Sequence, residues 1–200
     1  MINILAIYGS PRRNGNTSLL LREAVKGARD RGAAVNEVVL RDLHISPCLE
    51  IYACKKTGRC AIKDDFQSIY DQLLASDGLM LASPIFFYAV SAHTKTLMDR
   101  CQSLWVKRHY LDKKPYGKQP HKGKAIFISV GATKGRKLFD GPLLNMRYFL
   151  EALDMELWKS LLYRGLDCAG DVLKHPDYLA EAYRGGCDLY AALLSSVDIE

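Results

Sequence analysis

A polar loop between an apolar run and an amphipathic run constrains this chain more than any other feature. The loop spans Gly9 to Ser18, between an apolar run from Ile2 to Tyr8 and an amphipathic run from Leu19 to Arg29. A buried strand, a polar turn and a helix start together predict a phosphate site. The first N–H groups of a helix lack partners and carry the positive end of its dipole. The plainer alternative is an ordinary turn with Asn16 as the N-cap.

The residues of this loop suit an anionic ligand. Arg12 and Arg13 add positive charge, and Gly9 and Gly15 permit close approach of the backbone. The neutral donors are Ser10, Asn16, Thr17 and Ser18. The loop has neither the Gly-Lys-Ser/Thr ending of a nucleoside triphosphatase nor the Gly-x-Gly-x-x-Gly spacing of a dinucleotide site. It therefore predicts a phosphate site of another class.

Composition places the chain among globular proteins and excludes several function classes. Its 200 residues, 48% hydrophobic and 25% charged, suit one α/β domain over residues 1–200. No apolar run approaches the ~20 residues of a membrane helix, and no signal peptide precedes Met1. With six unevenly spaced cysteines, these features predict a cytoplasmic protein without disulfides.

The net charge of +6 suits anionic ligands but is too dispersed to predict nucleic-acid binding. Seven basic residues lie between Lys107 and Lys124, against the single acidic Asp112. This charge falls largely in a segment of little periodicity, Trp105 to Lys122, which we interpret as an excursion of a helix-to-strand connection. Such a run is either a solvated loop or a contact for nucleotide phosphates.

Strand-like and helix-like segments alternate to the end of the chain. The predicted strands are Ile2–Tyr8, Ala34–Leu40, Gly78–Ala82, Ala125–Val130 and Glu156–Leu162. The predicted helices are Leu19–Arg29, one opened by Asp64-Asp65, Val90–Leu104, Pro142–Ala152 and Tyr178–Leu194. The alternation predicts a flavodoxin-like, doubly wound sheet of five parallel strands in the order 2-1-3-4-5. Ligands of that fold lie beyond the carboxyl ends of the strands, at the switch point between strands one and three.

Two further loops are expected to meet the first at that edge. Ser83 to Val90 contains three consecutive aromatic residues, Phe86 to Tyr88, just past a buried strand. They suit contact with a flat, partly apolar ligand, or alternatively packing under the next helix or at a subunit contact. Gly131 to Lys137 is glycine-flanked and is placed to close over the same ligand.

Together these loops resemble the NAD(P)H-dependent FMN reductase family, and more closely its iron–sulfur flavoprotein branch. The matching motifs are Gly-Ser-Pro-Arg-x-x-Gly-Asn-Thr at Gly9–Thr17 and Ser-Pro-Ile-aromatic-aromatic-Tyr-x-Val-Ser-Ala at Ser83–Ala92. The chain departs from the family at Phe86, often tyrosine, and at Ala89, often asparagine or glycine. The resemblance implies that FMN binds here. Its phosphate would contact Ser10, Arg12, Asn16, Thr17 and Ser18, and its ring Pro84, Ile85, Phe86, Phe87, Gly131 and Ala132.

The iron–sulfur branch carries Cys-x-x-Cys-x-x-Cys-x5-Cys after the second strand, and this chain lacks one of those cysteines. Its loop has Cys48, Cys54 and Cys60, with Ile51 at the second ligand position. Ile51 cannot coordinate iron, so we expect no complete cluster. Three alternatives stay open for these thiols: an incomplete cluster, a redox-active pair, and inert packing. The other cysteines, Cys101, Cys168 and Cys187, are expected to be packing residues.

The resemblance implies an oxidoreductase that takes hydride from NADH or NADPH and reduces a flavin, quinone or other small acceptor. No side chain stands out as a general acid or base, because the cofactor carries the chemistry in such enzymes. An electron-transfer protein between protein partners and a flavin-binding regulatory module are the alternatives. The resemblance also implies a homodimer or homotetramer.

Overall fold

A computed structural model describes residues 1–116 and 121–197 of the chain. Its strands are β1 (Asn3–Tyr8), β2 (Ala34–Val39), β3 (Gly78–Phe86), β4 (Ala89–Val90), β5 (Gly123–Gly131) and β6 (Met155–Arg164). Its α-helices are α1 (Asn16–Asp30), α2 (Cys54–Thr57), α3 (Phe66–Ala75), α4 (Ala92–Arg100), α5 (Gln102–Trp105), α6 (Asp140–Leu153) and α7 (Pro176–Val197). Short helical turns are η1 (Leu40–Asp42), the π-helix η2 (Val106–Leu111) and η3 (Asp171–Lys174).

The strands form one sheet with the order β2-β1-β3-β5-β6, and all neighbours in this row are parallel. The two-residue β4 pairs antiparallel with the end of β3 and lies outside the row. Without β4, the row is the predicted order 2-1-3-4-5, which confirms the flavodoxin-like fold. The switch point therefore lies between β1 and β3, as expected for this class of sheet.

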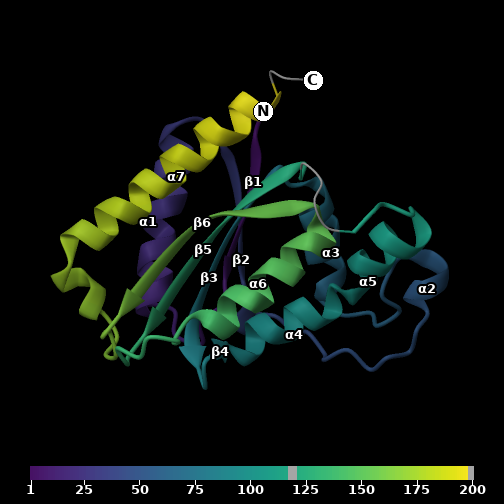
Figure 1. Cartoon of the computed structure of the whole chain (residues 1–200), viewed down its shortest axis with the longest axis horizontal. Helices are drawn as coiled ribbons and strands as arrows, with labels where there is room; N and C mark the ends of the chain where they lie inside the picture. The colour runs from purple at the N-terminus through teal and green to yellow at the C-terminus, as the bar shows by residue number, and fades with distance from the viewer. Residues whose placement is uncertain (117–120, 198–200) are drawn as a thin grey trace.

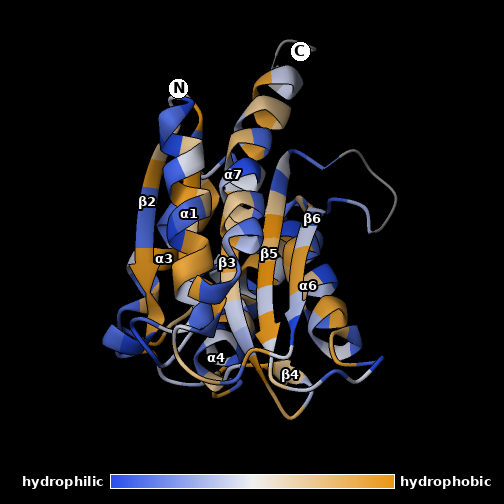
Figure 2. Ribbon diagram, turned by 90° about the vertical axis from the view of Figure 1, so that its left-hand side faces the viewer, coloured by the Kyte–Doolittle hydropathy of each residue, from blue (hydrophilic) through white to orange (hydrophobic). Residues whose placement is uncertain are grey.

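Helices cover both faces of the sheet (Figure 1). One core packs α1 and α7 against β1, β3 and β5 through side chains such as Ile4, Leu20 and Leu189. The other packs α3, α4 and α6 through Leu5, Phe66 and Phe149. Because both faces are covered, the central strands are apolar on both sides, as the orange along β5 in Figure 2 shows.

Helices α1 and α7 approach so closely that their backbones touch. A Cβ on Gly27 would collide with the carbonyl of Tyr183, and one on Gly186 with the carbonyl of Ala24. The thiol of Cys187, buried in the same contact, donates to the Gly27 carbonyl at 3.3 Å. Glycine is required at these two positions by the packing distance between the helices.

Four predictions about element bounds were wrong. α1 begins at Asn16, before the predicted start at Leu19, and its N-cap is Gly15, so the alternative with Asn16 as the N-cap is also wrong. β3 runs on through Phe86, so the predicted loop from Ser83 begins as strand. The predicted helix Val90–Leu104 begins after the short strand β4 and is interrupted at Cys101. The predicted excursion from Trp105 starts as helix and runs to Leu111, while its residues 117–120 lie outside the described residues.

No helix of the described ranges combines the length and apolarity that crossing a membrane requires.

Candidate functional site

A cavity of about 120 Å³ lies at the carboxyl edge of the sheet, between β1 and β3. It joins segments that are far apart in the sequence. Its lining residues are Ser10, Pro11, Arg12, Gly15, Asn16, Thr17, Pro84, Ile85, Phe86, Val130, Ala132, Leu166 and Asp167. All three predicted loops therefore contribute to one site.

Three of the predicted site residues lie elsewhere than on the cavity wall. Ser18 is buried, and its hydroxyl donates to the Arg12 carbonyl at 3.2 Å, inside the first loop. Phe87 is fully exposed at the tip of the β3–β4 hairpin. Gly131 ends β5, where a Cβ would lie 2.6 Å from the side chain of Leu138.

Hydrogen bonds tie the first loop to the segment that follows β6. Asn16 donates through Nδ2 to the Cys168 carbonyl (2.9 Å) and accepts through Oδ1 from Val172 N (3.2 Å). Arg12 donates to the Asp167 carbonyl at 3.3 Å. Both side-chain ends of Asn16 are thus occupied by protein groups, which fixes the wall that Leu166 and Asp167 form.

Asp171 fixes the backbone of the same segment, the one that follows β6. Its carboxylate accepts from Asp167 N (3.1 Å) and Cys168 N (2.8 Å) and pairs with Lys174 (2.9 Å). The pKa of Asp171 is lowered, first by the hydrogen bond from Lys174 and then by the one from Cys168 N. The carboxylate is therefore ionised at neutral pH and holds the turn in place.

The start of α1 faces the cavity with its N–H groups available for an anion. Its N-cap, Gly15, offers no side-chain acceptor, and its first turn contains no acidic residue. A Cβ on Gly15 would lie 2.9 Å from Ser10 Oγ, so the loop closes tightly around this point. Arg12 is the basic residue of the lining and Asp167 the acidic one. The helix dipole and the hydroxyls of Ser10 and Thr17 suit a phosphate group.

A network of buried serines joins the strands under the cavity. Ser91 Oγ donates to the Gly9 carbonyl (2.5 Å), and Ser83 Oγ accepts from Ser91 N (2.9 Å). Ser129 Oγ donates to the Ser83 carbonyl at 2.8 Å. This serine network links β1, β3, β5 and the start of α4, and Ser83 and Ser129 directly precede the cavity-lining residues Pro84 and Val130.

The β3–β4 hairpin has an unusual two-residue turn. Phe87 (φ 49°) and Tyr88 (φ 59°) both adopt left-handed backbone conformations, which Asn and Gly favour at these positions. The Tyr88 carbonyl lies so close to Gly141 that a Cβ there would collide with it. Phe86 of the same hairpin lines the cavity, so the strained turn holds one wall of the site.

Replacing Phe87 with asparagine is expected to raise the free energy of unfolding by about 1 kcal/mol. The left-handed conformation costs a non-glycine residue roughly 1–2 kcal/mol, and asparagine tolerates it better. Urea denaturation measures the change. Phe87→Ala is the matched control, because it removes the same ring but keeps the strain. Equal stabilities of the two variants would contradict this explanation.

Four of the seven basic residues between Lys107 and Lys124 can be placed relative to the carboxyl-edge cavity or to an ion-pair partner. Lys122 and Lys124 flank the first residue of β5, at the opposite end of that strand from the cavity. Arg108 and Lys107 form ion pairs with Asp154 (2.7 Å) and Asp112 (2.8 Å).

Cys168 is exposed, so the prediction that it packs in the interior was wrong. Cys101 and Cys187 are buried as predicted.

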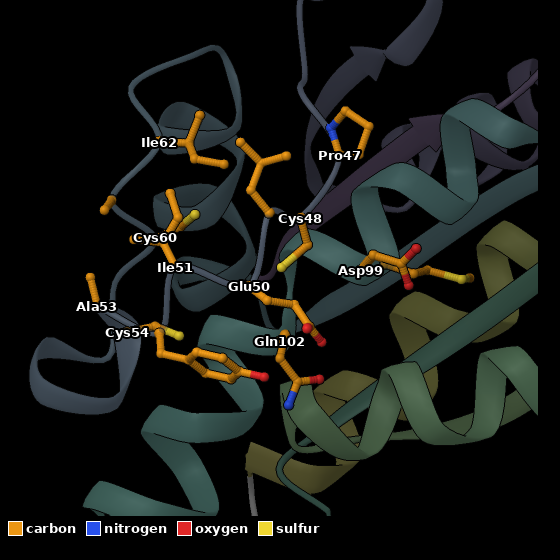
Figure 3. A pocket seen from close by; sticks show the side chains of 14 residues that line it. Pro47, Cys48, Glu50, Ile51, Ala53, Cys54, Cys60, Ile62, Asp99 and Gln102 are labelled. Carbon is orange, nitrogen blue, oxygen red and sulfur yellow. The ribbon is translucent and has the colours of Figure 1, made fainter.

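The cysteine loop (residues 41–63) surrounds a second cavity, of about 630 Å³, shown in Figure 3. Cys48, Cys54 and Cys60 all line it, and so does Ile51. The described residues contain no group of three or more His, Cys, Asp or Glu side chains placed to hold a metal ion. Cys48, Cys54 and Cys60 thus line one cavity without forming such a group among the described residues.

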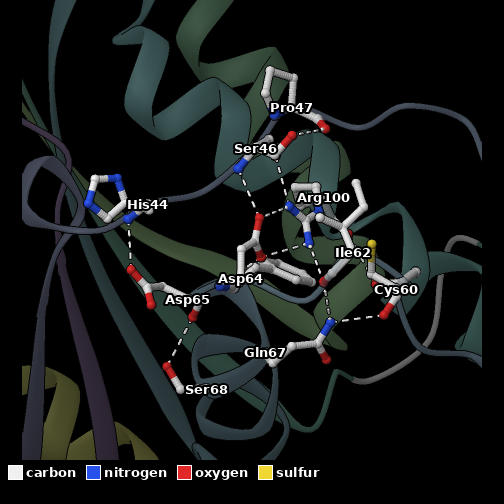
Figure 4. A network of polar contacts seen from close by, with 12 residues as sticks. His44, Ser46, Pro47, Cys60, Ile62, Asp64, Asp65, Gln67, Ser68 and Arg100 are labelled. Carbon is white, nitrogen blue, oxygen red and sulfur yellow. Dashed lines mark hydrogen bonds and ion pairs between the residues drawn. The ribbon is translucent and has the colours of Figure 1, made fainter.

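A buried ion pair supports the base of the cysteine loop (Figure 4). Arg100, with no exposed side-chain surface, donates to both carboxylate oxygens of Asp64 at 2.6 and 3.0 Å. It also donates to the carbonyls of Ser46 (2.8 Å) and Ile62 (3.3 Å), at the two ends of the loop. Burial lowers the pKa of Arg100, but its contacts with Asp64 and Cys60 outweigh burial and raise it.

The sheet order, with a cavity at the carboxyl edge of the sheet, defines a flavodoxin-like protein. The sequence model of the NADPH-dependent FMN reductases matches residues 2–156. The chain belongs to this family.

Individual relatives agree with that assignment. An iron–sulfur flavoprotein of Methanocaldococcus jannaschii is 40% identical over 105 residues, which cover 52% of this chain and 54% of that protein. The candidate NAD(P)H-dependent FMN-containing oxidoreductase of Bacillus subtilis is 25% identical over 184 residues, which cover 92% and 96%. The chain spans about half the length of the iron–sulfur flavoproteins it matches, with 54%, 51% and 59% for three of them.

Among solved structures, the NAD(P)H:quinone oxidoreductase from Methanothermobacter marburgensis has a TM-score of 0.68 at 16% identity. The match covers 94% of this chain and 96% of that one. At this identity it supports the fold alone.

Proposed function

We propose that this protein is an FMN-dependent oxidoreductase that takes hydride from NAD(P)H and passes electrons to a flavin, quinone or other small acceptor. The observation that carries the proposal is the cavity in which all three predicted loops meet at the switch point. Membership of the NADPH-dependent FMN reductase family supports the same cofactor.

The residues present fit the phosphate end of FMN. Ser10, Arg12 and Thr17, together with the α1 N-terminus, would hold the phosphate. The cavity volume of about 120 Å³ is below the roughly 300–1,000 Å³ of a pocket that encloses a whole ligand. The flat ring would therefore lie at the open side, against Ile85 and Phe86. Bound FMN supplies the hydride chemistry, and the chain positions it and tunes its surroundings.

Asn16 and Ser18 would act on the phosphate indirectly in this proposal. Asn16 fixes the segment after β6, and Ser18 fixes the carbonyl of Arg12. Gly131 and Phe87 would border the site from the end of β5 and from the hairpin tip, with Ala132 and Pro84 nearer the ring.

An electron carrier between protein partners is the second candidate function. The relatives named iron–sulfur flavoproteins favour it. In stopped-flow mixing under anaerobic conditions, an oxidoreductase should be reduced by NADH or NADPH at a rate that supports turnover. Rapid reduction by a ferredoxin with no reduction by either nicotinamide would favour the carrier.

Thr17→Val is expected to weaken FMN binding about tenfold. The change removes one hydroxyl donor to the phosphate and keeps the side-chain volume, and a hydrogen bond to a charged group contributes roughly 1.5–3 kcal/mol. Quenching of flavin fluorescence on titration gives the dissociation constants. Riboflavin, which lacks the phosphate, is the control, and its affinity should change less than twofold.

Equal weakening of riboflavin and FMN would contradict the placement of the phosphate on the first loop. Failure of the wild-type protein to bind either flavin would overturn the proposed function as a whole.

We also propose that the protein works in the cytoplasm as a homodimer or homotetramer. All six cysteines are free thiols, as expected in a reducing compartment. The exposed ring of Phe87, with those of Phe86 and Tyr88 beside it, supports a contact between subunits near the flavin site.

A further inference from the structure

The cavity under the cysteine loop has the properties of a small-molecule site. Its volume of about 630 Å³ lies within the roughly 300–1,000 Å³ of ligand pockets. It shares no lining residue with the cavity at the carboxyl edge among the residues described. The two are therefore separate sites.

The cavity has an apolar side and an acidic side (Figure 3). Ile51, Ala53 and Ile62 lie on one side, and Glu50, Asp99 and Gln102 on the other. No lysine or arginine is among the lining residues that the structure describes. An occupant of matching character would combine an apolar body with a positively charged end.

Glu50 is the carboxylate available to such an occupant. Asp99 is already paired with Lys95 at 2.6 Å, whereas Glu50 forms no ion pair within the described part of the chain. The pKa of the Tyr52 hydroxyl is raised, first by the charge of Glu50, so the two side chains lie close together. The ring of Tyr52 already accepts one ammonium group from this chain, since Lys55 Nζ lies 4.1 Å from its centroid.

The backbone holds Glu50 in place at a conformational cost. Glu50 (φ 51°) and Tyr52 (φ 61°) are both left-handed, on either side of Ile51. Asp64, which lies near the base of the loop, is committed to Arg100 and is not free to bind a ligand. The buried ion pair of Arg100 and Asp64 therefore supports the cysteine loop, while Glu50 lines the cavity.

We propose that this cavity binds a small organic cation with an apolar body. The apolar wall takes the body, and Glu50 binds the cationic end. This cavity is separate from the proposed flavin site, so an experiment can contradict one of the two proposals and leave the other standing.

Thioflavin T, a planar organic cation, is the probe. It is expected to bind the flavin-free chain of residues 1–200 at one site, and the anionic dye 8-anilinonaphthalene-1-sulfonate is expected to bind at least tenfold more weakly. Glu50→Gln should weaken thioflavin T about tenfold, since a charge-assisted contact becomes a neutral one. Glu156→Gln, the same change at an exposed carboxylate on β6, is the matched control and should have no effect.

A second measurement does not depend on the variants. Saturating thioflavin T should slow alkylation of Cys54 and Cys60 by iodoacetamide several-fold and leave exposed Cys168 unaffected, as read by mass spectrometry. Equal binding of the two dyes, no effect of Glu50→Gln, or no protection of these thiols would overturn the proposal.

Anaerobic reconstitution with iron and sulfide tests the alternative occupant directly. The wild-type chain is expected to retain no stoichiometric iron and acid-labile sulfide after desalting. Stoichiometric retention that is lost in Cys54→Ser would show a cluster in this cavity and would overturn the proposal.

Discussion

Replacing Arg100 with methionine is expected to lower the free energy of unfolding by about 3–5 kcal/mol. The guanidinium is fully buried, and it donates to Asp64, Ser46 and Ile62. Methionine fills a similar volume but leaves the carboxylate of Asp64 without its counter-charge. It also releases the two ends of the cysteine loop. Urea denaturation at neutral pH measures the loss.

Lys95→Met is the matched control for this variant. Like Arg100, Lys95 lies on α4 and pairs with an aspartate. Its partner is Asp99, at 2.6 Å, and both side chains of this pair are about half exposed. Exposed pairs contribute less than about 1 kcal/mol, so the control should change stability little. Similar losses in the two variants would contradict the importance of burial at Arg100.

The effect of Arg100→Met should also depend on pH. Burial raises the pKa of Asp64, but the hydrogen bonds from Arg100 and from Ser46 N outweigh it, and the net pKa lies below the ordinary 3.8. A lowered folded pKa stabilises the protein above the unfolded value, and this contribution is lost as the pH falls through the folded value. The difference between wild type and variant should therefore shrink below about pH 4. A constant difference down to pH 2 would contradict this assignment.

Gly186→Ala is expected to lower the free energy of unfolding by about 3 kcal/mol. The added methyl group would collide with the Ala24 carbonyl, so α1 and α7 would have to separate. Thermal and urea denaturation followed by circular dichroism measure the change. The loss should come with intact helix content, since only the distance between the two helices changes.

The neighbouring Gly185 provides the control for this prediction. A Cβ there would meet the ends of the Leu161 and Ile126 side chains, at 3.3 and 3.8 Å, and no backbone atom. Alanine also favours helix by roughly 1 kcal/mol over glycine, so Gly185→Ala should change stability by no more than about that amount. Equal destabilisation by the two substitutions would show that loss of glycine, rather than helix contact, is responsible.

The fold could be predicted because each element carries its own local pattern. Apolar runs marked the five parallel strands, and helical spacing marked α1, α3 and α7. The end of β3 could not be predicted in the same way. Ser83 and Pro84 are turn-forming residues, yet they continue the strand because they pair with Ser129 and Val130 of β5. That partner lies more than 40 residues away, and no local signal records it.

The candidate site was predictable to the extent that its residues lie in motifs. Ser10, Arg12 and Thr17 were found from the first loop. Leu166 and Asp167 were missed because their segment has no motif of its own. Asn16 brings that segment to the site through hydrogen bonds that span more than 150 residues of sequence. The segment that contains Leu166 and Asp167 has a glycine at each end, Gly165 and Gly170. These glycines were the one feature of the sequence that indicated a tight turn there.

The serine network beneath the carboxyl-edge cavity has a thermodynamic consequence. Ser83, Ser91 and Ser129 are buried, and their hydrogen bonds fix the ends of three strands before any ligand arrives. Ordering loops and side chains on association costs free energy, which reduces affinity. For the serine network, folding already orders these groups before a ligand binds. A ligand entering here therefore loses its own freedom of motion but immobilises little of the protein.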